Sequence, residues 1–254
     1  MKLLRKILVK VLGLKGYLKF ISRTYIKMIR RGMMKEQYPE IHYLASLLKP
    51  GMIVMDIGAN LGYYSSKMAD IVGADGKVIA VEPIPLFAEV FRSNTKRYSQ
   101  IDLHNVALGT EAKKVKMAIP VVDGVVRHGL TQVIDEKHNT SKHTEMSFEV
   151  DMVIGDELIS NQEITQLDYI KCDVEGYEQY VIPALAKTIE KYRPVLQVEL
   201  GGKENRENVV TFLKQKGYDV FILHNQSLEK IDESKLFSYT QDFYFKPHGK
   251  TIES

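Results

Sequence analysis

Short apolar runs alternate with longer stretches of helical periodicity from about residue 50 to the end of the chain. Three of the apolar runs end in acids: "IVMDIG" (53–58), "KVIAVEP" (77–83) and "LDYIKCDVEG" (167–176). The stretches between them repeat their apolar positions every three or four residues, which is typical of amphipathic helices. Strands that alternate with helices of roughly 10–15 residues predict a doubly wound, mostly parallel α/β sheet.

The first unit is the best defined. Its strand (53–57) leads through a glycine turn into a helix that ends near Val72, with Gly73 as its cap. Other expected helices lie within 36–51, 84–98, 177–192 and 205–217. The other expected strands are 77–83, 101–109, 113–120, 146–154, 167–176, 193–202, 218–225 and 241–247.

The middle of the chain has a different pattern. Residues 113–120 and 146–154 alternate like the strands of an antiparallel hairpin, and a long polar loop lies between them. We expect the loop, 120–145, to lie on the substrate side, because loops of this length are more often functional than idle. Its histidines 128, 138 and 143 match no zinc motif, so they are either solvated or reach over the site as acid–base groups.

Composition limits the fold and the cellular setting. The 254 residues suffice for one sizeable α/β domain, and 44% apolar residues are ordinary for a globular protein. The single cysteine, Cys172, lies in an apolar run, so we expect a buried thiol and a reducing compartment.

The charge is unevenly distributed. Residues 1–35 contain eleven lysines and arginines and no acid, whereas the remaining 219 residues contain 24 basic and 32 acidic side chains. The body is therefore mildly acidic, which argues against a nucleic-acid groove there. Basic residues interrupt the arm too often for a signal peptide or a membrane span. These features favour a cytoplasmic protein.

The basic arm has helical periodicity. One side is apolar, and the break is expected near Gly13 or Gly16. The apolar side consists of Leu4, Leu8, Leu18, Ile21, Tyr25 and Ile29. Two interpretations remain open: an interfacial helix on an anionic bilayer at the inner membrane face, or a cap that packs over the core or forms a dimer contact.

The glycine turn after the first strand predicts a ligand site. Asp56 ends the strand, and Gly58 and Gly62 would let the backbone approach a ligand closely. A dinucleotide fingerprint requires a third glycine three residues after the second, and none is present. Asp56 suits an ammonium group, and Glu82 at the end of the next strand suits a ribose diol. An adenosyl amino acid would satisfy both carboxylates.

These motifs carry a family resemblance. "VMDIGANLGYYS", "VIAVEP", "NVALG" and "LDYIKCDVEGYE" resemble, in order and spacing, the FkbM-type S-adenosylmethionine-dependent methyltransferases over roughly residues 50–200. The resemblance implies the class I methyltransferase fold, a Rossmann-like sheet of seven strands whose last strand is antiparallel between the fifth and sixth. It also implies methyl transfer to a hydroxyl, often of a sugar or polyketide.

The resemblance also implies site residues. Those expected to bind S-adenosylmethionine are Asp56, Gly58, Ala59, Asn60, Gly62, Glu82, Asn105, Ala107 and Asp173. Glu82 would bind the ribose, Asn105 and Ala107 would lie near the adenine, and Asp173 beside the transferable methyl.

The acids after the fourth strand are the expected catalytic groups. A hydroxyl is a weak nucleophile that gains from a nearby base, and Asp173 is the first candidate, with Glu175 second. Alternatives are that Glu175 only caps the following helix, or that Asp173, Glu175 and Glu199 bind Mg²⁺. We assign no metal.

We therefore expect a helical arm and cap (1–49) followed by a methyltransferase domain (50–254). The expected activity is O-methylation of a sugar, glycolipid or polyketide-like acceptor. The alternatives are a nucleotide-linked oxidoreductase and a catalytically inactive scaffold that docks on membranes.

Overall fold

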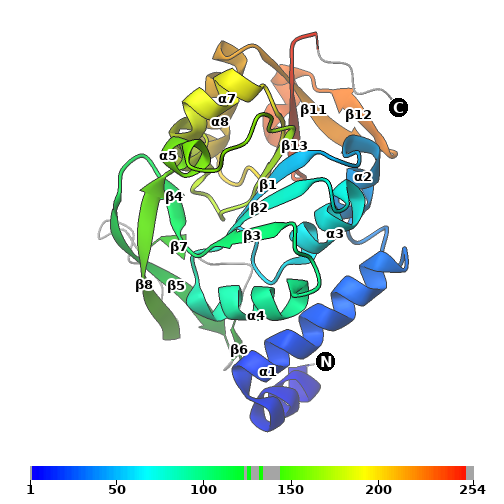
Figure 1. Ribbon diagram of the computed structural model, residues 1–254, viewed down its shortest axis with the longest axis vertical. Helices are drawn as coiled ribbons and strands as arrows, with labels where there is room; N and C mark the ends of the chain where they lie inside the picture. The colour runs from blue at the N-terminus through cyan, green and yellow to red at the C-terminus, as the bar shows by residue number, and fades with distance from the viewer. Residues whose placement is uncertain (1, 123–124, 127–131, 134–143, 250–254) are drawn as a thin grey trace.

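A central eight-stranded sheet organises the protein (Figure 1). The structure is a computed structural model that describes residues 2–122, 125–126, 132–133 and 144–249. In spatial order the strands are β12 (Ser227–Lys230), β11 (Tyr218–His224), β13 (Phe243–Pro247), β10 (Val195–Val198), β9 (Tyr169–Cys172), β1 (Ile53–Ile57), β2 (Lys77–Val81) and β3 (Ile101–His104).

The strand order is that of a class I methyltransferase. The five strands from β10 to β3 are parallel, and β13 is antiparallel to both of its neighbours, β10 and β11. The predicted seven strands and the antiparallel last strand are confirmed. The sequence did not predict β12, which extends the edge as a hairpin with β11.

The strand register places three polar residues in one row. Asp56 of β1 pairs with Lys171 of β9, and Lys171 pairs with Gln197 of β10. Partners in neighbouring strands point to the same face of a sheet. All three side chains are buried, so the sheet itself brings a lysine beside an aspartate within the core.

Helices cover both faces of the sheet (Figure 1). Packed against one face are α2 (Pro39–Leu47), α3 (Tyr63–Val72) and α4 (Pro85–Thr95). The other face is covered by α5 (Gly155–Ser160), α6 (Glu178–Val181), α7 (Ala186–Tyr192) and α8 (Lys203–Gln215). The helix expected over 177–192 is divided by a 3₁₀ turn (Pro183–Leu185), because proline disrupts the interior of a helix.

A second sheet contains the middle of the chain. Its strands are β4 (Ala107–Gly109), β8 (Thr144–Ile154), β5 (Lys113–Val122), β6 (Val125–Val126) and β7 (Gln132–Val133). The predicted hairpin is confirmed by the antiparallel pairing of β5 with β8. Histidines 128, 138 and 143 lie outside the described residues.

The prediction of a single strand over 101–109 is wrong. The chain leaves the central sheet after His104, and β4 pairs with β8 in the second sheet instead. At the break, the Asn105 amide donates hydrogen bonds to the carbonyl oxygens of Glu82 (2.7 Å) and Pro83 (3.0 Å). Those bonds hold the chain in a turn where a strand was expected.

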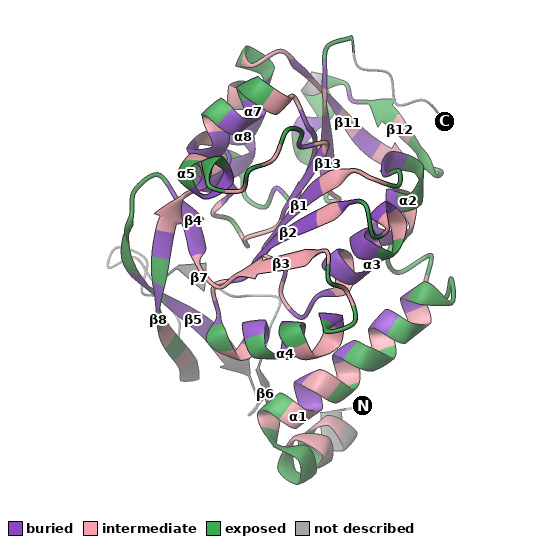
Figure 2. Ribbon diagram, viewed as in Figure 1, coloured by how far each residue is buried: buried purple, intermediate pink, exposed green. Residues whose placement is uncertain are grey.

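The basic arm forms α1 (Lys2–Arg30), which is broken at Gly13 (φ 66°, ψ 168°), one of the two predicted positions. Its second segment packs on α3 and α4. Leu18 and Ile29, expected on the apolar side, are buried there (Figure 2). Among the described helices none is long and apolar enough to cross a membrane.

Candidate active site

The turn between β1 and α3 is held by close contacts within the protein. Gly58 has φ 79°, and a Cβ atom there would lie 1.8 Å from the carbonyl oxygen of Asp173. Gly62 has φ 89°, and a Cβ atom would lie 3.1 Å from the Phe91 ring. Gly58 therefore lets the end of β1 approach the end of β9, and Gly62 lets the turn pack against α4.

Asp56 has one buried oxygen to offer a ligand. The Ser65 hydroxyl donates a hydrogen bond of 2.5 Å to Oδ2, and Oδ1 has no hydrogen-bond partner in the part of the chain that the structure describes. Burial raises the pKa of Asp56, and the charge of Lys171 acts in the opposite direction. A cationic amino group beside Oδ1 would satisfy the oxygen and favour the ionised carboxylate.

Lys171 and Asp173 form a buried ion pair. The two side chains are 3% and 27% exposed, and Nζ lies 2.9 Å from Oδ2 of Asp173. Nζ also lies 4.4 Å from the centre of the Tyr64 ring. Burial alone would lower the pKa of Lys171. The negative charges of Asp173, Asp56 and Asp242 have the larger effect, so the pKa is raised above its usual value. We did not predict Lys171, although a lysine inside a buried apolar strand was a usable signal.

A cavity of about 380 Å³ lies between this pair and the arm. The end of the sheet contributes Asp56, Gly58, Ala59, Asn60, Lys171 and Asp173 to its lining. The opposite wall comes from α1, α2 and the segment between them, and includes Arg5, Ile21, Tyr25, Ile29, Tyr38 and Ile41. Tyr25 lies edge-on to Tyr38 and to Tyr63, with ring centres 6.3 Å apart in both pairs. The arm therefore forms an aromatic wall opposite Asp173.

Glu82 is held rigidly at the end of β2. Its side chain is 4% exposed and accepts hydrogen bonds of 2.8 Å from the backbone N–H groups of Asn60 and Ile84. Burial raises its pKa to about 7, although both hydrogen bonds act to lower it. Each carboxylate oxygen accepts one bond there and has a second lone pair for a ribose hydroxyl.

A small apolar slot of about 30 Å³ adjoins the turn. Ala107 lines it, as do Val81 and Pro83 on either side of Glu82, whereas Glu82 lines neither this slot nor the larger cavity. Asn105, expected near the adenine, uses its amide to fix the turn after β2. Its amide therefore positions the backbone at Glu82 and Pro83.

The loop after β9 is fixed by Glu178. Its buried carboxylate accepts hydrogen bonds from the backbone N–H groups of Val174 (2.9 Å) and Gly176 (3.2 Å), and from the Asn205 amide (2.6 Å). Glu178 thus holds the loop that precedes α6, and neither it nor Glu175 forms a side-chain cap of that helix. Glu175 has φ 56°, a strained conformation for a non-glycine residue, and its side chain is free for another role.

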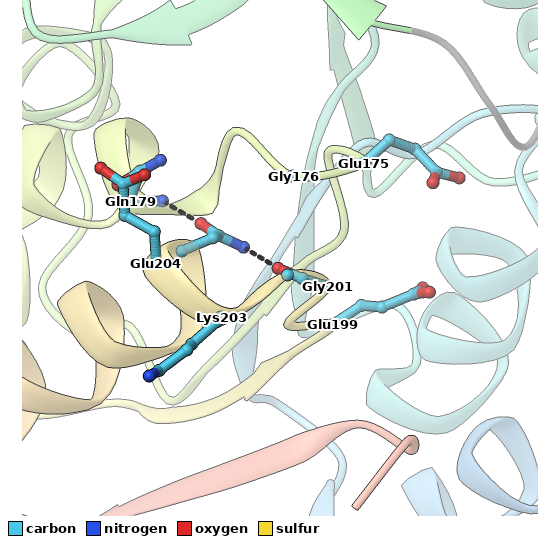
Figure 3. A pocket seen from close by; sticks show the side chains of 9 residues that line it. Glu175, Gly176, Gln179, Glu199, Gly201, Lys203 and Glu204 are labelled. Atoms are coloured by element: carbon cyan, nitrogen blue, oxygen red, sulfur yellow. Dashed lines mark hydrogen bonds between the residues drawn. The ribbon is translucent and has the colours of Figure 1, made fainter. Parts of the chain in front are cut away.

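Glu175 and Glu199 border a third pocket, of about 430 Å³. Their side chains extend to the same side, away from Gln179 and Glu204 (Figure 3). Partial burial and the neighbouring charge of Asp173 raise the pKa of Glu175 to about 7 and that of Glu199 to about 8. Within the described residues, no three His, Cys, Asp or Glu side chains are grouped as a metal site.

The expected site residues thus gather at the carboxyl edge of the sheet. Asp56, Gly58, Ala59, Asn60 and Asp173 share the larger cavity. Gly58 and Ala107 share the apolar slot. Lys171, Tyr64 and the tyrosines of the arm complete the site and were not predicted.

Comparison with known proteins shows which family the chain resembles. A family profile described as "Methyltransferase FkbM domain" matches residues 56–220. The crystal structure of a methyltransferase FkbM from Methylobacillus flagellatus has a TM-score of 0.51 and 14% identity. The superposition covers 94% of this chain and 60% of the Methylobacillus chain. At that identity the similarity concerns the fold alone.

Two curated relatives match over short segments. The protein-L-isoaspartate O-methyltransferase of Methanopyrus kandleri is 37% identical over 65 residues, which are 26% of this chain and 29% of the relative. Ribosomal RNA large subunit methyltransferase E of Coxiella burnetii is 42% identical over 60 residues, 20% of this chain and 28% of the relative. The chain spans less than a third of the length of either relative.

Proposed function

The chain belongs to the FkbM family of S-adenosylmethionine-dependent methyltransferases, and we propose that it methylates a hydroxyl of a sugar, glycolipid or polyketide-like acceptor. The observation that carries this proposal is the buried Lys171–Asp173 pair, which faces an aromatic-walled cavity beside the unpartnered Oδ1 atom of Asp56. These groups provide, in one place, a cofactor anchor, a carboxylate for the acceptor and a wall to hold it.

The cofactor fits the polar groups of the turn. Asp56 would accept hydrogen bonds from its amino group, and Glu82 from its ribose hydroxyls. Ala107 and the other residues of the apolar slot would lie against the adenine. When bound, S-adenosylmethionine supplies a methyl carbon that exchanges its bond to sulfur for a bond to the acceptor oxygen.

In this proposal Asp173 and Glu175 remove the proton from the acceptor hydroxyl. A carboxylate that accepts a hydrogen bond from the acceptor hydroxyl orients it and takes its proton as the new bond forms. Lys171 fixes the direction of the Asp173 carboxylate through the 2.9 Å contact between Nζ and Oδ2. Glu175, with its pKa raised to about 7, is suited to take up the proton near neutral pH.

The arm holds the acceptor in the cavity that Asp173 lines. Tyr25 and Tyr38 of the arm, together with Tyr63 of α3, combine apolar ring faces with hydroxyl groups that can form hydrogen bonds. Such side chains suit an acceptor that has both apolar faces and many hydroxyls, as a sugar ring does. This composition of the cavity wall favours a glycan or glycolipid over a fully apolar acceptor.

Calorimetry and a transfer assay test the proposal. We expect S-adenosylhomocysteine to bind and NAD not to bind. Radiolabelled methyl groups should pass from S-adenosylmethionine to hydroxyls in a panel of sugars, glycolipids and polyketide alcohols. NAD binding alone would favour an oxidoreductase, and the absence of any cofactor binding a scaffold. Transfer to a protein carboxylate, the reaction in the name of the Methanopyrus relative, would contradict the proposal.

A further inference from the structure

The outward face of α1 exposes large apolar side chains. Ile7 is 49% exposed, Val11 74%, Leu12 43% and Phe20 55%. Figure 2 shows exposed and buried positions of α1 alternating along the helix, as expected when only one side packs on the core. The buried positions Tyr17, Leu18, Ile26 and Ile29 occupy the inner side of α1. The arm is therefore apolar on two sides, and packing on the core covers only one of them.

The basic residues of the arm also form two groups. One group is attached to the core: Lys15 pairs with Glu89, Arg23 donates a 2.8 Å hydrogen bond to the Ser93 hydroxyl, and Arg30 pairs with Asp70 at 2.8 Å. The other group is exposed and has no ion pair among the described residues: Lys6, Lys10, Lys27 and Arg31.

We propose that the outward face of α1 docks on an anionic lipid bilayer. No acid occurs in residues 1–35, so the exposed cations have no partner of their own within the arm, and a negatively charged surface complements them. The apolar side chains between these cations give the pattern of a helix that lies in a membrane interface. Nucleic acid would engage the cations but leave Val11 and Phe20 without an apolar partner.

The cavity described above lies on the inner side of the same helix, opposite the docking face. Arg5 from the first segment of α1, and Ile21, Tyr25 and Ile29 from the second, line the cavity opposite Asp173. A docked arm would therefore hold the acceptor cavity near the lipid headgroups. The docking stands without the proposed function, whereas delivery of a lipid-linked acceptor rests on it.

Vesicle binding by the full chain tests the docking. We expect cosedimentation with vesicles of phosphatidylcholine mixed with phosphatidylglycerol, weaker binding at high salt, and little binding to phosphatidylcholine alone. Since each basic residue near such a surface contributes a several-fold gain in affinity, Lys6→Glu/Lys10→Glu should weaken binding at least about tenfold. Val11→Glu/Phe20→Glu should weaken it to a similar extent.

Matched controls separate docking from folding and from the reaction. Lys187→Glu and Phe237→Glu each make one substitution of the same kind at an exposed position outside the arm and should bind vesicles like the unchanged protein. S-adenosylhomocysteine affinity should be equal in all variants. Equal binding to both kinds of vesicle, unchanged binding by the arm variants, or binding only to an RNA competitor would overturn the docking. Activity on a water-soluble acceptor tests the proposed function separately.

Discussion

The carboxyl edge of the central sheet and the α1 arm use lysine in opposite ways. At the sheet edge one lysine, Lys171, is buried against Asp173, and Asp56 and Asp242 also raise its pKa. On the arm eleven basic residues share a segment without a single acid, and several of them are exposed. Removing one partner of a buried pair costs far more than disrupting an exposed pair. The few buried charges are therefore the ones that we propose for the reaction, and the many exposed ones are those that we propose for an external partner.

The largest effect is expected from Asp173→Asn, which preserves shape but removes the negative charge. Turnover should fall by about 10²–10⁴-fold, the usual contribution of a general base. Binding of S-adenosylhomocysteine should change much less, because Asp56 and Glu82 hold the cofactor in this proposal. Turnover measured with saturating cofactor, together with calorimetry, tests the separation. Turnover close to that of the unchanged protein would remove Asp173 from the reaction.

Lys171→Met tests the buried pair by stability. It leaves the buried Asp56 and the partly exposed Asp173 without their cation, so we expect a loss of about 3–5 kcal/mol of unfolding free energy. The loss should shrink at low pH, where the Asp56 carboxylate takes up a proton, because burial raises its pKa. Urea unfolding at two pH values measures both effects. A stability equal to that of the unchanged protein would mean that water already screens the pair.

Much of the sheet and its edge could be predicted from local patterns. Strand β1 and the end of α3 at Val72 match the expected residues, because apolar periodicity and glycine caps are local signals. The positions of Asp56 and Glu82 at strand ends were predictable for the same reason, since acids that follow buried strands stand out in the sequence.

The remaining features depend on contacts that are distant in sequence. Whether 101–109 is one strand or two is decided by the pairing of β4 with β8, some 45 residues later. The aromatic wall of the cavity forms only once α1 packs on α3 and α4. Of the two interpretations of the apolar side of the arm, packing on the core as a cap describes the second segment of α1. The apolar residues that stay exposed can be identified only once it is known which side of the arm packs on the core.

Glu82→Ala should weaken cofactor binding without the large loss of turnover expected at Asp173. A hydrogen bond to a charged acceptor contributes roughly 1.5–3 kcal/mol, so the Kd for S-adenosylhomocysteine should rise about tenfold or more. Part of the loss will come from the backbone N–H groups of Asn60 and Ile84, which lose their acceptor. The control compares the affinity of an adenosine analogue with that of its 2′-deoxyadenosine counterpart. If the two affinities differ in Glu82→Ala as much as they do in the unchanged protein, Glu82 does not bind the ribose.

The pH dependence of turnover distinguishes the sheet edge from the arm. If Glu175 takes up the acceptor proton with a pKa of about 7, turnover should rise by about tenfold from pH 6 to pH 8 as the carboxylate ionises. Glu175→Gln should flatten this profile. Vesicle binding should stay constant over the same range, because lysine and arginine side chains remain charged throughout. A flat profile in the unchanged protein would leave Asp173 as the base.

The smallest effect is expected from Lys15→Met, the same substitution as Lys171→Met made in the arm. Lys15 pairs with Glu89 of α4, but the two side chains are 49% and 52% exposed. Water screens such a pair, and fixing two long side chains costs conformational entropy, so the net contribution is small. The melting temperature should change by no more than about 2 °C, against a large fall for Lys171→Met. Scanning calorimetry of both variants in one buffer measures the contrast. A comparable fall for both would mean that the attachment of α1 to α4 supports the core as strongly as the buried pair does, and that the arm is part of the cooperative fold.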